Sequence, residues 1–157
     1  MQDRRQFLVG TLSSGLVFAA QPTFASVTVS DLILRHSNSA RRTKGVRKVR
    51  RSTKLDRAAD YYAQHLARSG VFSHTADGRT LKQRLRKHGV GNGWMAENLA
   101  YRSSRHPGDS LAKLFVQGWL DSPGHRRNLL HPKLTHIGIG VAKTQSRVYA
   151  VQVFWGG

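Results

Sequence analysis

The hydrophobic positions of residues 52–68 repeat with the period of an α-helix. Spacings of three and four residues place them on one helical face, and they are Leu55, Ala58, Ala59, Tyr62 and Leu66. Ser52 or Thr53 can cap the start of this helix, and Gly70 can end it. We therefore expect a long amphipathic helix here, with one apolar side facing a core.

Weaker helical patterns occur on both sides of this segment. Residues Ser30–Ala40 predict a short helix capped by Ser30, and Thr80–His88 predict another that ends at Gly89. Asp109–Leu120 is amphipathic. The dipeptide Ser122-Pro123 fits the N-cap and first position of a further short helix, where the missing N–H of proline costs nothing.

Two segments near the C-terminal end have the composition of β-strands. Ile137–Val141 and Val148–Trp155 are rich in Val, Ile and aromatic residues, and a polar turn at 144–146 separates them. Helices packed around a small sheet favour an α/β fold arranged as a three-layer α-β-α sandwich. The length of 157 residues fits a single domain.

The first 25 residues have the organisation of a signal peptide. Arg4 and Arg5 precede the mostly apolar stretch Phe7–Ala20, which is too short for a bilayer span of about 20 residues. Ala25 suits cleavage before Ser26. The run resembles a twin-arginine signal; an ordinary secretory signal or a cytosolic protein are the alternatives. We expect a signal at 1–25, a domain at 26–157 without a transmembrane segment, and export to the periplasm or beyond the cell.

The composition limits the chemistry and suggests a class of partner. The chain has no cysteine, so disulfides and thiolate metal sites are excluded, and a metal would need His, Asp or Glu ligands. Lys and Arg number 26 against 8 acidic residues, a net charge of +18. Such a chain should attract polyanions, either nucleic acid or an anionic envelope component. Expected export and the lack of a nucleic-acid-reading motif argue against nucleic acid.

Much of this charge lies in one segment, residues 41–54. Its basic residues are Arg41, Arg42, Lys44, Arg47, Lys48, Arg50, Arg51 and Lys54. We expect a solvated basic loop. It either binds a polyanion or is exposed without a fixed partner.

Four local signatures follow one another along the chain. They are Gly70-Val71-Phe72-Ser73-His74, Ala96-Glu97-Asn98-Leu99-Ala100-Tyr101, Trp119–Leu130 with its Ser-Pro-Gly-His-Arg core, and Ile137–Ala142 followed by Tyr149–Phe154. In this order they resemble bacterial domains of the CAP superfamily (SCP, pathogenesis-related-1-like) over Asp31–Trp155. The resemblance implies an α/β/α sandwich, which agrees with the periodicity.

The resemblance also implies a cavity lined by two histidines and two glutamates. His74 matches the first histidine, Glu97 the first glutamate and His125 the second histidine. Ser122 occupies the position of the second glutamate, so the tetrad is incomplete. Any chemistry that needs all four groups is therefore in doubt.

Glu97 is the only glutamate in the chain, and it lies in a largely apolar stretch. It either joins the imidazoles as a metal ligand, a partner of a ligand or a base for bound water, or it pairs with an arginine or backbone N–H groups to brace a loop. His74 and His125 could hold Zn²⁺ or another divalent cation, or be hydrogen-bonded cavity residues without metal.

The remaining candidates are weaker. We expect Trp119 and Trp155 in the core and Trp94 at the surface, where it could stack on a ligand. His-Glu-x-x-His and Gly-x-Ser-x-Gly patterns are absent. The expected signal, the basic surface, the incomplete tetrad and the resemblance to a family of mostly binding and secretion modules favour a non-catalytic binding module for a lipid, a peptide or an anionic envelope ligand. The alternative is a metal-assisted hydrolase acting on peptide or cell-wall bonds.

Overall fold

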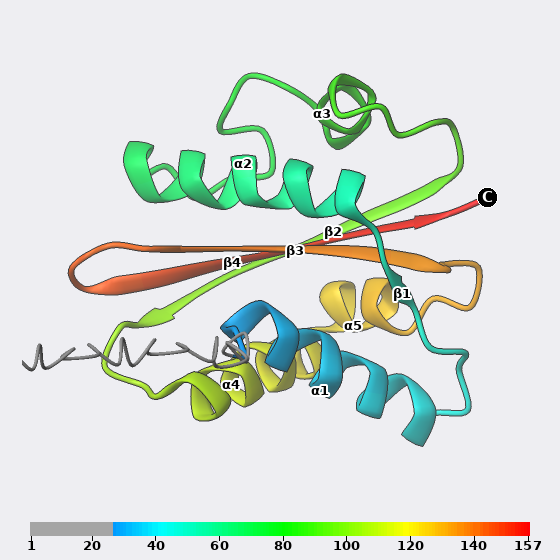
Figure 1. The fold of residues 1–157 in the computed structure, drawn as a ribbon, viewed down its shortest axis with the longest axis horizontal. Helices are drawn as coiled ribbons and strands as arrows, with labels where there is room; N and C mark the ends of the chain where they lie inside the picture. Colours follow the sequence, from blue (N-terminus) through cyan, green and yellow to red (C-terminus); the bar gives the residue numbers. More distant parts are fainter. Residues whose placement is uncertain (1–26) are drawn as a thin grey trace, which may run out of the picture.

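A four-stranded mixed sheet forms the middle layer of the computed structural model, which describes residues 27–157 (Figure 1). The expected signal sequence lies outside the described residues. The strands, in the spatial order β1-β3-β4-β2, are β1 (Arg50–Arg51), β3 (His136–Lys143), β4 (Arg147–Gly156) and β2 (Trp94–Ser103). β1 pairs with β3 in parallel, and the other neighbours are antiparallel.

Helices cover both faces of this sheet (Figure 1). On one face lie α2 (Thr53–Ser69) and α3 (Leu81–Lys87), and on the other lie α1 (Val29–Thr43), α4 (Gly108–Asp121) and α5 (Pro123–Leu129). The expected three-layer α-β-α sandwich is thereby confirmed. None of the helices within residues 27–157 combines the length and apolar character that crossing a bilayer requires.

The helix boundaries follow local capping chemistry. α2 begins after Ser52 and ends at Gly70, whose φ of 70° is left-handed, as predicted. α1 differs from expectation, because its N-cap is Thr28 rather than Ser30. Thr28 Oγ1 accepts from the backbone N–H of Asp31 at 3.2 Å, and the Asp31 carboxylate accepts from that of Thr28 at 3.0 Å. This capping box moves the start of the helix toward the N-terminus.

The central strand β4 is buried on both faces and divides its side chains between two cores. Val148, Ala150 and Phe154 pack with α1, α4 and α5. The alternate positions, which include Val151 and Val153, pack with α2. The period of two in a strand thus links both helical layers through one element.

Two glycines of β3 allow α2 to pack directly on the sheet. A Cβ built on Gly138 would lie 2.0 Å from the carbonyl carbon of Leu55, and one on Gly140 would lie 2.1 Å from the carbonyl oxygen of Ala59. These distances are far below van der Waals contact, so any side chain here would push the helix away.

The basic segment 41–54 is not a single solvated loop. Its first residues finish α1, Arg50–Arg51 form β1, and α2 begins at Thr53. Arg41 is fully buried, and its guanidinium donates to the carbonyl oxygens of Arg47 (2.8 Å) and Leu129 (2.7 Å), among others. Burial lowers the pKa of Arg41. The expectation of a uniformly solvated loop was wrong for this residue, because the carbonyls replace its water.

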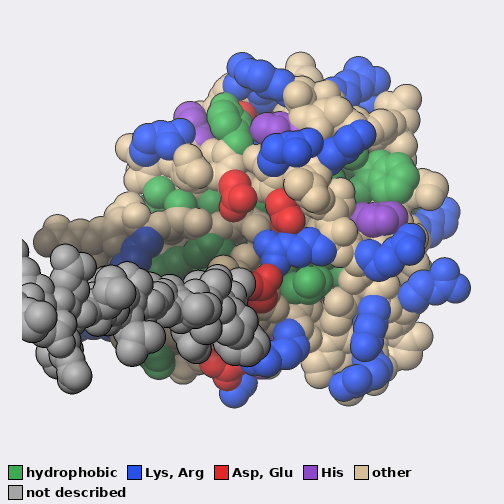
Figure 2. All heavy atoms as spheres, in the orientation of Figure 1, with side chains coloured by type: hydrophobic (Ala, Val, Ile, Leu, Met, Phe, Trp, Pro, Cys, Tyr) green, Lys and Arg blue, Asp and Glu red, His purple; other side chains and the backbone are tan. Residues whose placement is uncertain are grey.

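Most of the other cations lie at the surface. Figure 2 shows Lys and Arg side chains around much of one face, with a few acidic side chains nearer its middle. Arg51 pairs with Asp31 and Asp56. Exposed Lys and Arg side chains also lie outside residues 41–54, so the positive charge is not confined to that segment.

Candidate functional site

The predicted site residues lie along the free edge of β2. Glu97 is on this strand, His74 is on the connection between α2 and α3, and His125 is on α5. Beside the strand runs an open cleft of about 390 Å³. It is lined by Phe72, Leu99, Ala100, Tyr101, Arg102, Gly118, Trp119, Ser122 and His125.

The carboxylate of Glu97 is buried and has a partner on each oxygen. Oε1 is hydrogen-bonded to Nδ1 of His74 at 2.8 Å, and Oε2 accepts from Nη2 of Arg84 at 2.7 Å. The side chain of Glu97 is 3% exposed and that of Arg84 is 1% exposed. Of the alternatives for Glu97, the structure thus shows the arginine pair, with His74 on the other oxygen.

Arg84 is the functional neighbour that sequence reasoning missed. Its guanidinium lies 3.4 Å from the ring centre of Tyr62 and donates to Asp77 at 2.9 Å. A lone glutamate in an apolar stretch signals a buried cation, but nothing in the sequence singles out Arg84 among so many arginines.

The hydroxyl of Tyr62 fixes the connection that carries His74. It donates to the carbonyl of Ser73 and accepts from the backbone N–H of Ala76 at 3.0 Å. Burial raises the pKa of Tyr62, so the hydroxyl keeps its proton at neutral pH. His74 is therefore held in place from α2 as well as from Glu97, although its own side chain is 57% exposed.

His125 faces the cleft from the first turn of α5 and is half-buried. Burial lowers the pKa of His125, and the nearby charge of His74 lowers it further. Ser122, just before α5, also lines the cleft, so this position supplies a hydroxyl rather than a carboxylate.

A second polar network joins β2 to the helical layer of α1, α4 and α5. Asn98 donates to the carbonyl of His125 at 3.1 Å, and Asn128 donates to Asn98 Oδ1 at 3.1 Å. Buried Gln152 accepts from Asn98 at 3.3 Å and donates to Ser37 at 2.7 Å. These buried amides fix the position of α5, and hence of His125, relative to the strand.

Side chains cover the outer edge of β2. Alternate carbonyl oxygens of the strand each accept a side-chain N–H, and the pairs are Glu97 with Asn128 (3.1 Å), Leu99 with Trp119 (3.1 Å) and Tyr101 with Arg102 (2.9 Å). A sheet edge with occupied carbonyls is a poor template for another strand. A ligand in the cleft therefore meets side chains rather than a free backbone ladder.

The residues present do not fit a complete metal site. Within residues 27–157, no three His, Asp or Glu side chains gather closely enough to hold an ion. Both oxygens of Glu97 are engaged, and the cationic Arg84 beside it opposes a metal charge. His74 and His125 alone supply fewer than the three protein ligands of a catalytic zinc site.

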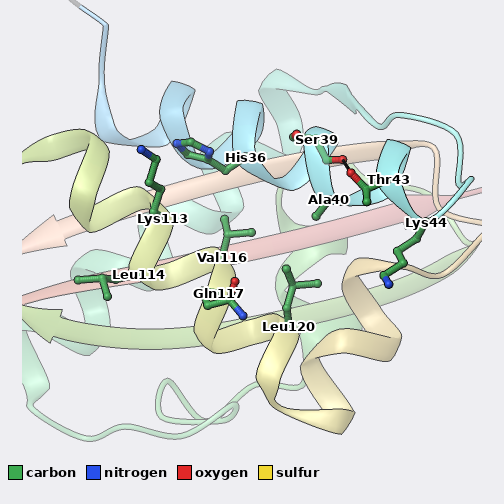
Figure 3. Close-up of a pocket in the computed structure, with 10 residues that line it drawn as sticks. All are labelled: His36, Ser39, Ala40, Thr43, Lys44, Lys113, Leu114, Val116, Gln117 and Leu120. Carbon is green, nitrogen blue, oxygen red and sulfur yellow. Dashed lines mark hydrogen bonds between the residues drawn. The ribbon is translucent and has the colours of Figure 1, made fainter.

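Another hollow, of about 570 Å³, lies between α1 and α4 (Figure 3). Figure 3 shows His36 and Lys113 together near one end and Leu120 and Lys44 near the other. His36 and Lys113 both bond Asp109, at 2.9 and 2.8 Å. None of the predicted site residues lines this groove.

The α-β-α sandwich has counterparts in known proteins. Residues 34–155 match the family model described as CAP, the cysteine-rich secretory protein family. The chain belongs to the CAP family. It does so without any cysteine, so its fold is held by the two cores and the buried polar networks.

Two curated relatives from Bacillus subtilis are identical to this chain at about a quarter to a third of the aligned residues. The uncharacterized membrane protein YlbC of Bacillus subtilis is 32% identical over 123 residues, which cover 78% of this chain and 33% of that protein. The chain spans less than half the length of the curated relatives it matches.

Solved structures of CAP domains superpose well on this chain. An extracellular protein containing a SCP domain from Bacillus anthracis has a TM-score of 0.72 at 26% identity, with 82% of this chain and 40% of that chain covered. An outer surface protein of Borrelia burgdorferi has a TM-score of 0.72 at 24% identity, covering 82% of this chain and 92% of that chain.

Proposed function

We propose that this CAP domain is an exported, non-catalytic binding module whose ligand lies in the cleft beside β2. The proposal rests on the hydrogen bonding and the burial of Glu97. Its two oxygens are committed to Arg84 and His74, and its side chain is buried. A carboxylate held in a buried ion pair is a structural group rather than a free general base.

The cleft favours a ligand with an apolar part and an anionic group. Phe72 and Tyr101 are both exposed, and their rings meet edge to face with centres 5.0 Å apart. The guanidinium of Arg147 lies 4.6 Å from the ring centre of Tyr101, and Arg102 lines the cleft. Anionic lipids and acidic peptides have this combination of properties, and a peptide would bind through its side chains because the strand edge is covered.

Dodecyl phosphate tests this proposal, with dodecyl maltoside as the uncharged probe of equal chain length. The full chain should bind the phosphate more tightly, and the Phe72→Ala/Tyr101→Ala double variant should weaken that binding about tenfold in calorimetry. Leu114→Ala, in the α1–α4 groove, is the matched control and should leave the affinity unchanged. Equal affinities for both probes, or loss only in Leu114→Ala, would refute the assignment of this cleft.

The export part of the proposal rests on residues 1–25. Adjacent arginines before an apolar stretch support a twin-arginine signal. Replacing both by lysine, Arg4→Lys/Arg5→Lys, preserves charge but removes the pattern. Cell fractionation should then find the protein retained inside; unchanged export would indicate an ordinary secretory signal instead.

The alternative function is a metal-assisted hydrolase, favoured only by the placement of His74 on Glu97 of β2 and of His125 in the cleft beside the same strand. It predicts that Glu97→Gln abolishes cleavage of peptide or cell-wall substrates while ligand affinity persists. Under the binding proposal, the wild-type chain shows no such cleavage, and Glu97→Gln alters only stability or affinity.

A further inference from the structure

The end of β2 opposite the cleft carries an exposed aromatic group among cations. Trp94 is the first residue of the strand and is 53% exposed, whereas Trp119 is buried in the core. The ring of His131 stacks on Trp94 with centres 5.0 Å apart, and Nζ of Lys133 lies 4.4 Å from the indole centre. The strand rises about 3.4 Å per residue, so Trp94 is roughly 24 Å from Tyr101 and this surface is distinct from the cleft.

The segment before Trp94 is fixed to the domain. The indole N–H of Trp155 donates to the carbonyl of Gly91 at 3.2 Å, and Lys54 donates to that of Gly89 at 3.1 Å. A Cβ on Gly93 would lie 2.6 Å from the carbonyl oxygen of Gly156, so this residue packs flush against the end of β4. Trp94 is thus presented from a rigid base, which reduces the entropy lost on binding.

A hollow of about 550 Å³ beside Trp94 is lined by Thr80, Leu81, Lys82, Gly93, Trp94 and Met95. Lys82 is exposed at this hollow, Lys133 is exposed at the ring itself, and no carboxylate is among the lining residues. Figure 2 shows a hydrophobic patch with a histidine beside it near the C-terminal end of β4, bordered by Lys and Arg. The surface therefore combines an apolar ring with positive charge.

We propose that this surface, the Trp94 platform of Trp94, His131, Lys133 and Lys82, binds an acidic glycan. A pyranose ring has a flat face of C–H groups that can pack on an indole, while its carboxylate or phosphate substituents pair with the two lysines. A single-stranded nucleic acid fits less well, because it requires several exposed rings in series. Trp155 does not supply a second exposed ring for such a ligand, because it is only partly exposed and its indole N–H already donates to the carbonyl of Gly91.

Calorimetric titration of the full chain with a short oligogalacturonate tests the platform. Trp94→Ala should weaken binding about tenfold, and Trp94→Phe should retain most of the affinity. The Lys82→Ala/Lys133→Ala variant should weaken binding and reduce its salt dependence. Because these three side chains are exposed, the thermal melting temperature should stay near the wild-type value, which separates loss of binding from loss of folding.

Removing two cations elsewhere on the surface distinguishes a specific site from general attraction between a basic protein and an acidic glycan. Arg42→Ala/Lys48→Ala removes two exposed cations, one in the last turn of α1 and one in the segment after it, and should leave oligogalacturonate binding unchanged. The proposal is overturned if both double variants weaken binding equally, if Trp94→Ala binds like wild type, or if oligogalacturonate does not bind. It is also overturned if a single-stranded oligodeoxynucleotide of equal charge binds more tightly with the same dependence on Trp94, which would make the platform a nucleic-acid site.

Discussion

Arg84 donates a hydrogen bond of 2.7 Å to Glu97, and both side chains are almost completely removed from water. Arg84→Met would leave Glu97 and Asp77 without their buried cation. Removal of one partner from a buried pair costs about 3–5 kcal/mol, so we expect a loss of that size in the free energy of unfolding, measured with urea.

The exposed Arg86 on the same helix is the matched control for this prediction. Arg86→Met should change the stability by less than about 0.5 kcal/mol. The double variant Arg84→Met/Glu97→Gln should recover part of the loss, since it no longer buries an unpaired Glu97. If Arg84→Met were as stable as Arg86→Met, the buried pair would have no structural role.

Gly140 lets α2 contact the sheet, so its replacement should separate the two layers. Gly140→Ala places a methyl group 2.1 Å from the carbonyl oxygen of Ala59, and we expect a loss of about 1–3 kcal/mol. Gly124→Ala is the control, because its added methyl group would meet only the end of Arg127 at 3.9 Å. Thermal unfolding of both variants checks the contrast, and equal melting temperatures would contradict it.

The depressed pKa of His125 predicts a pH-dependent stability. At pH values below 6.5, the ordinary pKa of histidine, the unfolded chain protonates His125 more readily than the folded chain does. The free energy of unfolding therefore decreases as pH falls. Above that value the contribution is constant. We expect His125→Gln to lose less stability than wild type between about pH 7 and about pH 5.

Urea unfolding of both proteins across this range measures the difference. Burial and neighbouring charges also lower the pKa of His88, which therefore contributes to both curves equally. Parallel curves for wild type and His125→Gln would show that His125 is not the group responsible.

Zinc should not bind tightly at the cleft, because Glu97 is already paired with Arg84. Calorimetric zinc titrations of the wild type and of His74→Ala/His125→Ala should therefore give the same weak binding. Micromolar or tighter binding that disappears in the double variant would place a metal between the two imidazoles and would reopen the hydrolase alternative.

The regular elements could be predicted where the periodicity was strong. α2 and β4 have a clear period of 3.6 or a dense run of strand-forming residues, and both formed close to the predicted bounds. β2 was not predicted, because its buried polar residues, Glu97 and Asn98, interrupt the apolar pattern. Their partners come from other elements, so the single segment does not reveal why they are buried.

The candidate site was predictable only in part for the same reason. His74, Glu97, His125 and Ser122 follow from family motifs, and the structure locates all four at the edge of β2. Arg84 does not follow from them, because its role depends on α3 lying across Glu97. Arg84 meets Glu97 only through tertiary packing, so no regular spacing in the sequence indicates that the two residues are in contact.

The position of β4 has a consequence for how the chain folds. This strand is the last element of the domain, yet it lies between β3 and β2 and carries side chains of both cores. Earlier helices can form during synthesis, but β2 has no partner in the sheet until the final strand inserts between it and β3. Folding is therefore dominated by contacts between distant parts of the chain and is completed only after the last residues of the domain have been made.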